Sequence, residues 1–271
     1  MSSQASGPGD KVLVVHPAFA GERVGLDFAL GVQRLVARRL RACGRPAVFA
    51  LARARVDEAQ VAADPDAGWK VGDMVAAAIE SWPEDLVTQM VVAQFGCKWA
   101  VLPEFQAVGG GCRLTTGLFE VDARGRLQAL EAWSFEGENV GLPEHLVTLV
   151  DGIARRTGTN TPWADAAGLF GTPEPIPALY YLRALGYCSQ IEDGCRVDRR
   201  QVLATMCVAL EGAPDMVPLI ELVPEIVYAL ARAGANDLEL AQWLRELRQR
   251  AGADAWPALL DEARAARAGV D

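Results

Sequence analysis

Apolar and polar positions at the start of the chain alternate between strand-like and helix-like periods. A continuous β-branched run from Lys11 to Val15 predicts a strand covered on both faces. Apolar residues recur at helical spacing from Gly25 to Cys43, and Gly44 and Pro46 then stop the predicted helix. Ala47 to Ala52 reads as a second short buried strand. This opening predicts a β-α-β unit.

Two more helices and three more strands are predicted between residues 83 and 156. Proline at a first helical position and a one-sided apolar pattern favour helices at Pro83–Phe95 and Pro143–Arg156. Period-two alternation between them predicts strands joined by turns that contain glycine. The strands are expected at Lys98–Phe105, Arg113–Asp122 and Leu127–Phe135. The buried face of the last strand is expected to carry Leu127, Ala129, Trp133 and Phe135.

The composition changes near residue 158. Residues 158–177 are dense in Thr, Gly and Pro, which predicts a linker between two domains. The fold class predicted is α/β, a mixed sheet with flanking helices at 11–157 after a disordered tail at 1–10. An all-α helical-repeat-like or bundle domain is expected at 178–268. Its helices are expected at Ala178–Ser189, Asp198–Glu211, Ile220–Ala233, Asp237–Ala251 and Trp256–Ala268, with Asp198 and Asp237 as N-caps.

Charge, hydropathy and cysteine content indicate which partners, location and cofactors to expect. The net charge is −9 over 271 residues, which lowers the expectation of nucleic acid or an anionic membrane as a partner. The first residues carry no signal-peptide pattern, and no apolar run reaches the length of a membrane span, so a cytoplasmic protein is expected. Six cysteines without paired short spacings indicate reduced, buried thiols, and neither a metal nor another cofactor is expected.

The order of elements resembles the TolB amino-terminal-like domain. The matching details are Phe95-Gly96-Cys97-Lys98 at a helix end, Val121-Asp122 before a glycine turn, and Trp133 followed by Phe135. The stretch "PIPALYYLRALGYCSQ" resembles the first helix of the tetratricopeptide-like arrays that often follow that domain in cytoplasmic bacterial proteins. The helices lack the Trp, Leu, Gly and Tyr marks of a regular repeat unit, so a divergent array and a simple bundle stay open. The resemblance implies contacts with other proteins and no catalytic residues.

Two groups of side chains are candidates for an interaction surface. Arginines gather in the second half of the first long helix, and Arg34, Arg38 and Arg41 represent them. A solvated helix face is the ordinary interpretation, and binding of a phosphate or an acidic partner is the functional one. The second group consists of aromatic residues at the predicted linker, Trp163, Tyr180 and Tyr181. These indicate either core packing or a groove for a partner peptide.

Catalytic patterns are weak throughout the sequence. The two histidines, His16 after the first strand and His145 in a helix, have no nucleophile motif near them, and Gly109-Gly110-Gly111 lacks the Lys-Ser/Thr of a phosphate loop. The sequence therefore favours a non-enzymatic protein-interaction, scaffold or regulatory module, with a protein partner and room for a homo-oligomer through a sheet edge. The alternative is a small-ligand or nucleotide-binding sensor near His16, and an enzyme with an unrecognised site is the third reading.

Overall fold

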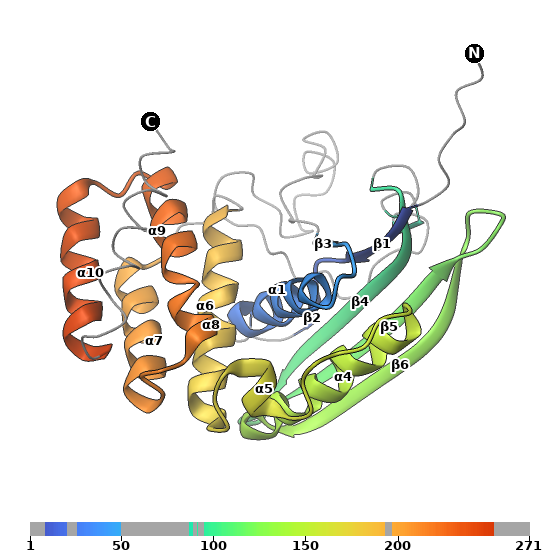
Figure 1. Cartoon of the computed structure of the whole chain (residues 1–271), viewed down its shortest axis with the longest axis horizontal. Coiled ribbons are helices and arrows are strands. Elements are labelled where there is room, and N and C mark those ends of the chain that lie inside the picture. The colour runs from blue at the N-terminus through green and yellow to red at the C-terminus, as the bar shows by residue number, and fades with distance from the viewer. Residues whose placement is uncertain are drawn as a thin grey trace, which may run out of the picture.

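A mixed six-stranded sheet organises the protein (Figure 1). The computed structural model describes residues 9–20, 26–49, 87–88, 91, 95–192 and 197–251. The strand order is β3-β1-β4-β5-β6, and β2 pairs with β4 beside this path. The pairs β1–β3, β1–β4 and β2–β4 are parallel, whereas β4–β5 and β5–β6 are antiparallel. The strands are β1 (Gly9–Val14), β2 (Ala18–Ala20), β3 (Ala47–Phe49), β4 (Cys97–Val108), β5 (Gly111–Val121) and β6 (Leu127–Glu138).

Two hairpins join the three long strands, as the alternation predicts. Gly109 and Gly110 both have positive φ, 32° and 90°, at the turn between β4 and β5. Residues with a side chain rarely adopt a positive φ, so the glycines are needed for this turn. In the turn between β5 and β6, the Asp122 carboxylate accepts hydrogen bonds from the main-chain N–H groups of Arg124 and Arg126 at 2.8 and 2.9 Å. Both turns are therefore explained by local chain geometry.

A β-bulge in β6 makes the predicted buried face of this strand wrong. Leu118 of β5 is opposite Glu131, whereas the next residue, Phe119, is opposite Ala129, so Leu130 is extra. One extra residue reverses which side chains point to which face. Trp133 and Phe135 pack on the face that α1 and α4 cover, and Leu127 packs on the opposite face. Leu130 itself is exposed.

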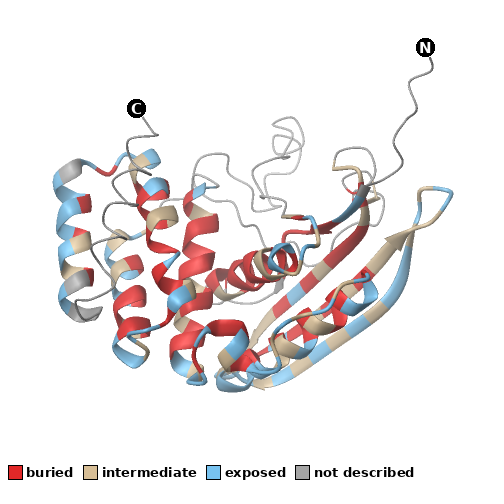
Figure 2. Ribbon diagram, in the orientation of Figure 1, coloured by how far each residue is buried: buried red, intermediate tan, exposed pale blue. Residues whose placement is uncertain are grey.

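Two helices cover one face of the sheet (Figure 2). Helix α1 (Leu26–Ala42) and helix α4 (Leu142–Arg156) begin and end within a residue of their predicted bounds, and the short helix η5 (Asn139–Gly141) precedes α4. Their apolar side chains pack against strand residues such as Val14, Val101 and Leu114. On the opposite face Val87 and Val91 are buried, four residues apart within the helix predicted at 83–95, most of which lies outside the described residues.

The second half of the described chain is helical. Helices α5 to α10 are Ala166–Phe170, Pro175–Glu192, Arg199–Gly212, Val217–Ile220, Val223–Arg232 and Asp237–Ala251. The single helix predicted at Ile220–Ala233 is two helices, α8 and α9, because Pro224 lacks an N–H and therefore sits in the first turn of α9. Asp198 caps α7 as predicted, but Asn236 rather than Asp237 caps α10, exchanging hydrogen bonds of 3.0 Å with Glu239.

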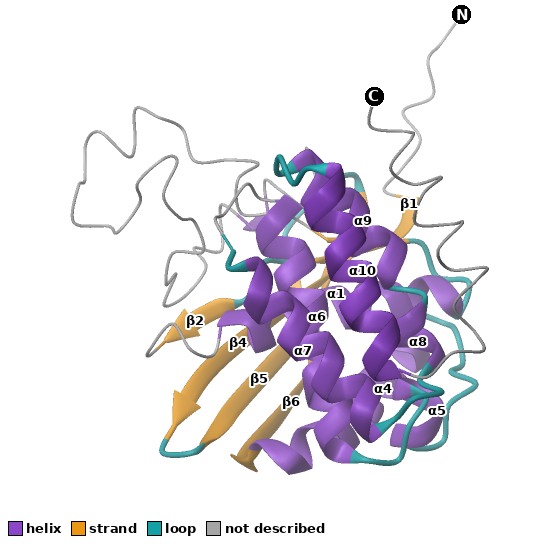
Figure 3. Ribbon diagram, turned by 90° about the vertical axis from the view of Figure 1, so that its left-hand side faces the viewer, coloured by secondary structure: helices purple, strands orange, loops and turns teal. Residues whose placement is uncertain are grey.

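Helix α6 packs directly on α1, on the side away from the sheet (Figure 3). Two glycines make this possible: a β-carbon at Gly31 of α1 would lie 2.0 Å from the Leu182 carbonyl oxygen. A β-carbon at Gly186 of α6 would lie 1.9 Å from the Asp27 carbonyl oxygen. One apolar cluster continues from the sheet through α1 into the helices. The predicted linker at 158–177 contains α5, and Phe170 in it is buried.

Several predictions fall on residues that the structure does not describe. These are residues 1–8 of the tail predicted at 1–10, the residues Ala50 to Ala52 of the second predicted strand, Cys195 and the last helix at Trp256–Ala268. The prediction is wrong for the last two residues of that tail, Gly9 and Asp10, because they begin β1. Within the described ranges, no helix combines the length and the apolar character that crossing a bilayer requires.

Candidate functional site: a groove between α7, α9 and α10

A groove of about 810 Å³ lies between α7 and α10 and reaches the end of α9. Volumes of roughly 300–1,000 Å³ are typical of sites that bind small molecules or anchoring side chains. The helix ends that form it are fixed by polar caps, Asp198 for α7 and Asn236 for α10. Side chains from all three helices line it: Leu203, Ala204 and Cys207 of α7, Leu230 of α9, and Leu240 and Trp243 of α10.

The floor of the groove is apolar, and Trp243 is its largest side chain. Trp243 is 6% exposed, and its indole N–H has no hydrogen-bond acceptor among the residues that the structure describes. A buried donor without an acceptor costs about 1–3 kcal/mol. Because the indole nitrogen itself is fully buried, a molecule in the groove meets the apolar part of the Trp243 ring rather than its N–H.

The two rims of the groove differ in net charge. Asp198, Arg199 and Arg200 lie on the α7 rim, which is therefore basic on balance, and Glu239 and Glu246 lie on the acidic α10 rim. Arg199 and Glu239 join the rims through an ion pair, with Nη1 2.6 Å from Oε2. Such an exposed pair contributes little to stability, and it leaves Arg200 and Glu246 to face a bound molecule. The groove thus combines an apolar floor with one basic and one acidic rim.

The predicted interaction residue Arg34 lies elsewhere, in the interface of α1, α6 and α9. Arg34 is 6% exposed, so the solvated-face interpretation is wrong for it, because α6 and α9 cover this side of α1. Its guanidinium donates to both carboxylate oxygens of Glu192, at 2.7 and 2.9 Å, and to Glu225 at 2.9 Å. These carboxylates raise the pKa of Arg34 above its usual value, against the effect of burial.

The other arginines of α1 also make contacts within the chain. Arg38 pairs with Glu225 of α9, and the Nε of Arg41 donates to the Ala47 carbonyl at 2.6 Å. The guanidinium of Arg39 lies over the ring of Trp163, 5.1 Å from its centre. The arginine group therefore connects α1 with the rest of the fold.

The two tyrosines lie on α6, away from the groove. Tyr181 is almost fully buried, and its ring meets Phe170 edge-on at 6.4 Å between centres. Tyr180 is half-buried beneath the guanidinium of Arg183, 5.6 Å from its ring centre. The structure thus brings Arg34, Arg38 and Tyr181 together around α1 and α6, but places none of the six predicted residues in the groove.

Neither a protein-family model nor a curated protein matches this chain at a significant level. The resemblance to the TolB amino-terminal-like domain therefore stays a prediction from the order of elements. Because folds host many unrelated activities, function has to be argued from the geometry of a site.

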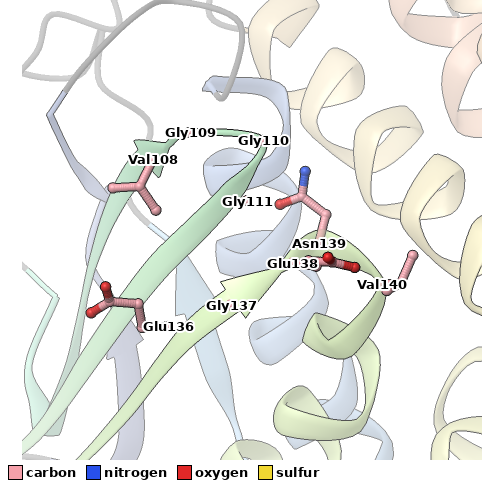
Figure 4. A pocket seen from close by; sticks show the side chains of 9 residues that line it. All are labelled: Val108, Gly109, Gly110, Gly111, Glu136, Gly137, Glu138, Asn139 and Val140. Carbon is pink, nitrogen blue, oxygen red and sulfur yellow. The ribbon is translucent and has the colours of Figure 1, made fainter.

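A second hollow lies at the end of the β4–β5 hairpin (Figure 4). Gly109, Gly110 and Gly111 face Glu136, Glu138 and Asn139 across it. The two carboxylates point in different directions, and Arg113 pairs with Glu136 at 2.7 Å. Within the described ranges no three His, Cys, Asp or Glu side chains gather closely enough to hold a metal ion. The geometry of this hollow does not define a site.

The two histidines pack inside the fold. His16, just after β1, is buried, and its Nδ1 lies 3.0 Å from the Pro17 carbonyl, to which it donates. Burial lowers the pKa of His16 to about 4. His145 packs against Phe135 with 5.4 Å between ring centres, and burial lowers its pKa as well. The chain at 21–25 and 50–86, which follows β2 and β3, lies outside the described residues, so the sensor site near His16 stays a prediction.

His16 is expected to make the protein less stable in acid. The unfolded chain takes up a proton near pH 6.5, whereas folded His16 does so only near pH 4. Stability conferred by neutral His16 is therefore complete above pH 6.5 and falls as the pH drops toward 4. By a pH of about 5 the expected loss is about 2 kcal/mol. Urea unfolding near neutral pH and at a pH of about 5 should show this loss in the free energy of unfolding. The loss should be smaller by the same amount in His16→Gln, which has no imidazole. An equal dependence of the unfolding free energy on pH in the two proteins would contradict this prediction.

The described cysteines carry no reactive signature. Burial raises the pKa of Cys97 and Cys112 to about 11 and that of Cys188 to about 12, so these thiols stay protonated. No disulfide joins any of the five described cysteines. Cys207 lies in the groove floor, where it is buried.

The sequence interpretation missed the groove residues. Trp243 stands in a helix that is otherwise rich in charge, with Leu240 and Leu247 at helical spacing on either side. A lone tryptophan on such a stripe was a usable signal for a contact surface. Which helices it faces could be learned only from the packing.

Proposed function

We propose that this protein is a protein-interaction module that binds a peptide segment of another protein in the groove between α7, α9 and α10. The observation that carries the proposal is the apolar floor of Leu203, Cys207, Leu230, Leu240 and Trp243 between two charged rims. Helical arrays commonly present such grooves, and amphipathic helices bind in them through apolar residues one turn apart. We further propose that the chain is related to TolB-like and tetratricopeptide-like proteins, and that the helices from α6 onward form a separate helical domain.

Charge selects the kind of peptide. Arg199 and Glu239 already pair with each other, so Arg200 on the α7 rim favours an acidic side chain on one flank, and Glu246 on the α10 rim favours a basic side chain on the other. The expected partner segment therefore has an apolar stripe, with acidic residues along one side and basic residues along the other.

A displayed library of peptides tests the proposal on the full-length chain. Segments of about 15 residues suffice, since isolated helices become marginally stable near that length. The selected sequences are expected to share the apolar stripe and its two charged flanks, and isothermal titration then gives their affinity. Enrichment of sequences without a common pattern would contradict the proposal, and so would binding of small molecules alone.

A matched pair of substitutions locates the binding surface. Ala204 is exposed and lines the groove, so Ala204→Arg should fill it and abolish peptide binding. Gln201 is exposed on the same helix and does not line the groove, so Gln201→Arg should bind normally. Unchanged binding by Ala204→Arg would place the peptide elsewhere.

Trp243→Phe tests the contact with the largest side chain of the floor. This change keeps an aromatic ring but removes part of the indole together with its N–H, so peptide affinity should fall about fivefold through lost apolar contact. The free energy of unfolding should also fall by about 1 kcal/mol, because the smaller ring leaves a cavity at a position that is 6% exposed. An unchanged affinity would show that the peptide does not contact Trp243.

A further inference from the structure

We propose that two copies of this chain associate through β6, with the β6 strands pairing side by side and antiparallel. β6 ends the strand order and pairs only with β5 among the described strands. In Figure 1 it runs along the margin of the described fold. Its outer side therefore offers main-chain N–H and C=O groups to another strand.

β6 lacks two of the usual protections of an edge strand, a short length and a lysine or proline. It is 12 residues long, whereas β3, at the opposite end of the strand order, has three residues in the described part of the chain. Natural edge strands are commonly short or contain lysine or proline, and β6 contains neither residue. The bulge beside Leu130 is the irregularity that its register shows. Eight residues, from Glu131 to Glu138, follow it in regular pairing.

The charges of β6 fit a second copy of itself. Its charged residues are Glu131, Glu136 and Glu138. Antiparallel registers centred on Trp133, Ser134 or Phe135 place each glutamate opposite an uncharged residue of the second copy, which avoids like-charge pairs. Within each copy Glu131 already pairs with Arg156 at 2.5 Å and Glu136 with Arg113 at 2.7 Å, and these pairs reduce the remaining repulsion.

Two exposed apolar residues lie at the two ends of the regular part of β6. Leu130 at the bulge is 40% exposed, and Val140 in the short helix η5 is 45% exposed. A twofold interface repeats each contact, so a dimer through β6 can cover both residues in both copies. We therefore expect a symmetric dimer whose two sheets continue through the paired β6 strands.

Sedimentation velocity of the full-length protein over a range of concentrations tests this inference. A reversible dimer is expected, and added salt should strengthen it because each copy carries a net charge of −9. Ala132→Glu combined with Ser134→Glu puts glutamates opposite glutamates in all three registers. Both residues are exposed on the sheet face away from α4, so this variant should fold normally and dimerise at least about tenfold more weakly.

Two controls separate the edge from other causes. Ala132→Gln combined with Ser134→Gln changes size without charge and should still dimerise. Gln201→Glu combined with Gln249→Glu adds the same net charge at exposed positions of α7 and α10 and should also dimerise.

A chain that is monomeric at every concentration overturns the proposal. A dimer that the Ala132→Glu, Ser134→Glu variant leaves unchanged also overturns it, because the contact then lies on another surface. The groove substitution Ala204→Arg should not alter dimerisation, so this test and the peptide test fail separately.

Discussion

Gly186→Ala is expected to destabilise the protein by about 4 kcal/mol, even though alanine is the better helix former by about 1 kcal/mol. The new β-carbon would lie 1.9 Å from the carbonyl oxygen of Asp27, which belongs to the backbone of α1. A backbone cannot rotate away as a side chain can, so α6 and α1 must separate. Urea unfolding followed by far-ultraviolet circular dichroism measures the loss.

Gly152→Ala provides the comparison for this substitution. Its β-carbon would meet the ring of Trp133 at 2.6 Å, but this contact is with a side chain on an edge strand. The ring can shift, and the expected loss is about 1 kcal/mol. If Gly186→Ala were the milder change of the two, or stabilised the protein as helix propensity alone predicts, the close crossing of α1 and α6 would be refuted.

Arg34→Ala is expected to lower the free energy of unfolding by about 3 kcal/mol. The guanidinium holds Glu192 of α6 and Glu225 of α9 against α1, and its side chain is 7% exposed. Its removal leaves a cavity and takes the shared partner from Glu192 and Glu225, of which Glu225 still pairs with Arg38. Both carboxylates are about one-third exposed, so water compensates part of the loss. Chemical unfolding of the single variant measures the effect.

The charge effect and the packing effect of Arg34 can be separated. Arg34→Met keeps much of the apolar stem and should be less damaging than Arg34→Ala. Adding Glu192→Gln to Arg34→Met removes one of the unbalanced carboxylates and should restore part of the stability. Independent, additive losses for the two changes would show that Arg34 and Glu192 do not interact, in conflict with their 2.7 Å contact.

The sequence predicted the sheet elements well because their patterns are local. The alternation that gives β4, β5 and β6 and the glycines at their turns act over a few residues, and so do the caps that bound α1 and α7. The bulge at Leu130 could not be predicted, because it depends on how β6 meets β5 across the hairpin. One extra residue was enough to move Leu127 to the other face.

The role of the arginines could not be predicted for a different reason. The spacing of Arg34 and Arg38 shows that they share a side of α1, and an exposed helix face would have the same spacing. Their acidic partners Glu192 and Glu225 lie more than 150 residues away in sequence. Only the packing of α6 and α9 on α1 shows that these arginines are structural.

The sequence predicts a peptide groove in the helical region, but not the residues that line it. A groove for a peptide in the helical region was one interpretation of the aromatic residues, but Tyr181 is buried beside Phe170 and Trp163 lies under Arg39. Trp243, which lines the groove, belongs to a helix whose bounds were predicted correctly. Which residue of a helix lines a groove depends on its neighbours in space, and local pattern does not supply them.

Helix α1 has the sheet on one side and α6 on the other, although α6 is synthesised much later. On the ribosome, the nascent sheet and α1 emerge while the partner of Gly31 is still inside the exit tunnel. An uncovered apolar surface on a growing chain attracts chaperones and favours misassembly. Folding during translation is therefore expected to finish only once α6 emerges, and stalled chains that end before Pro175 should remain protease-sensitive.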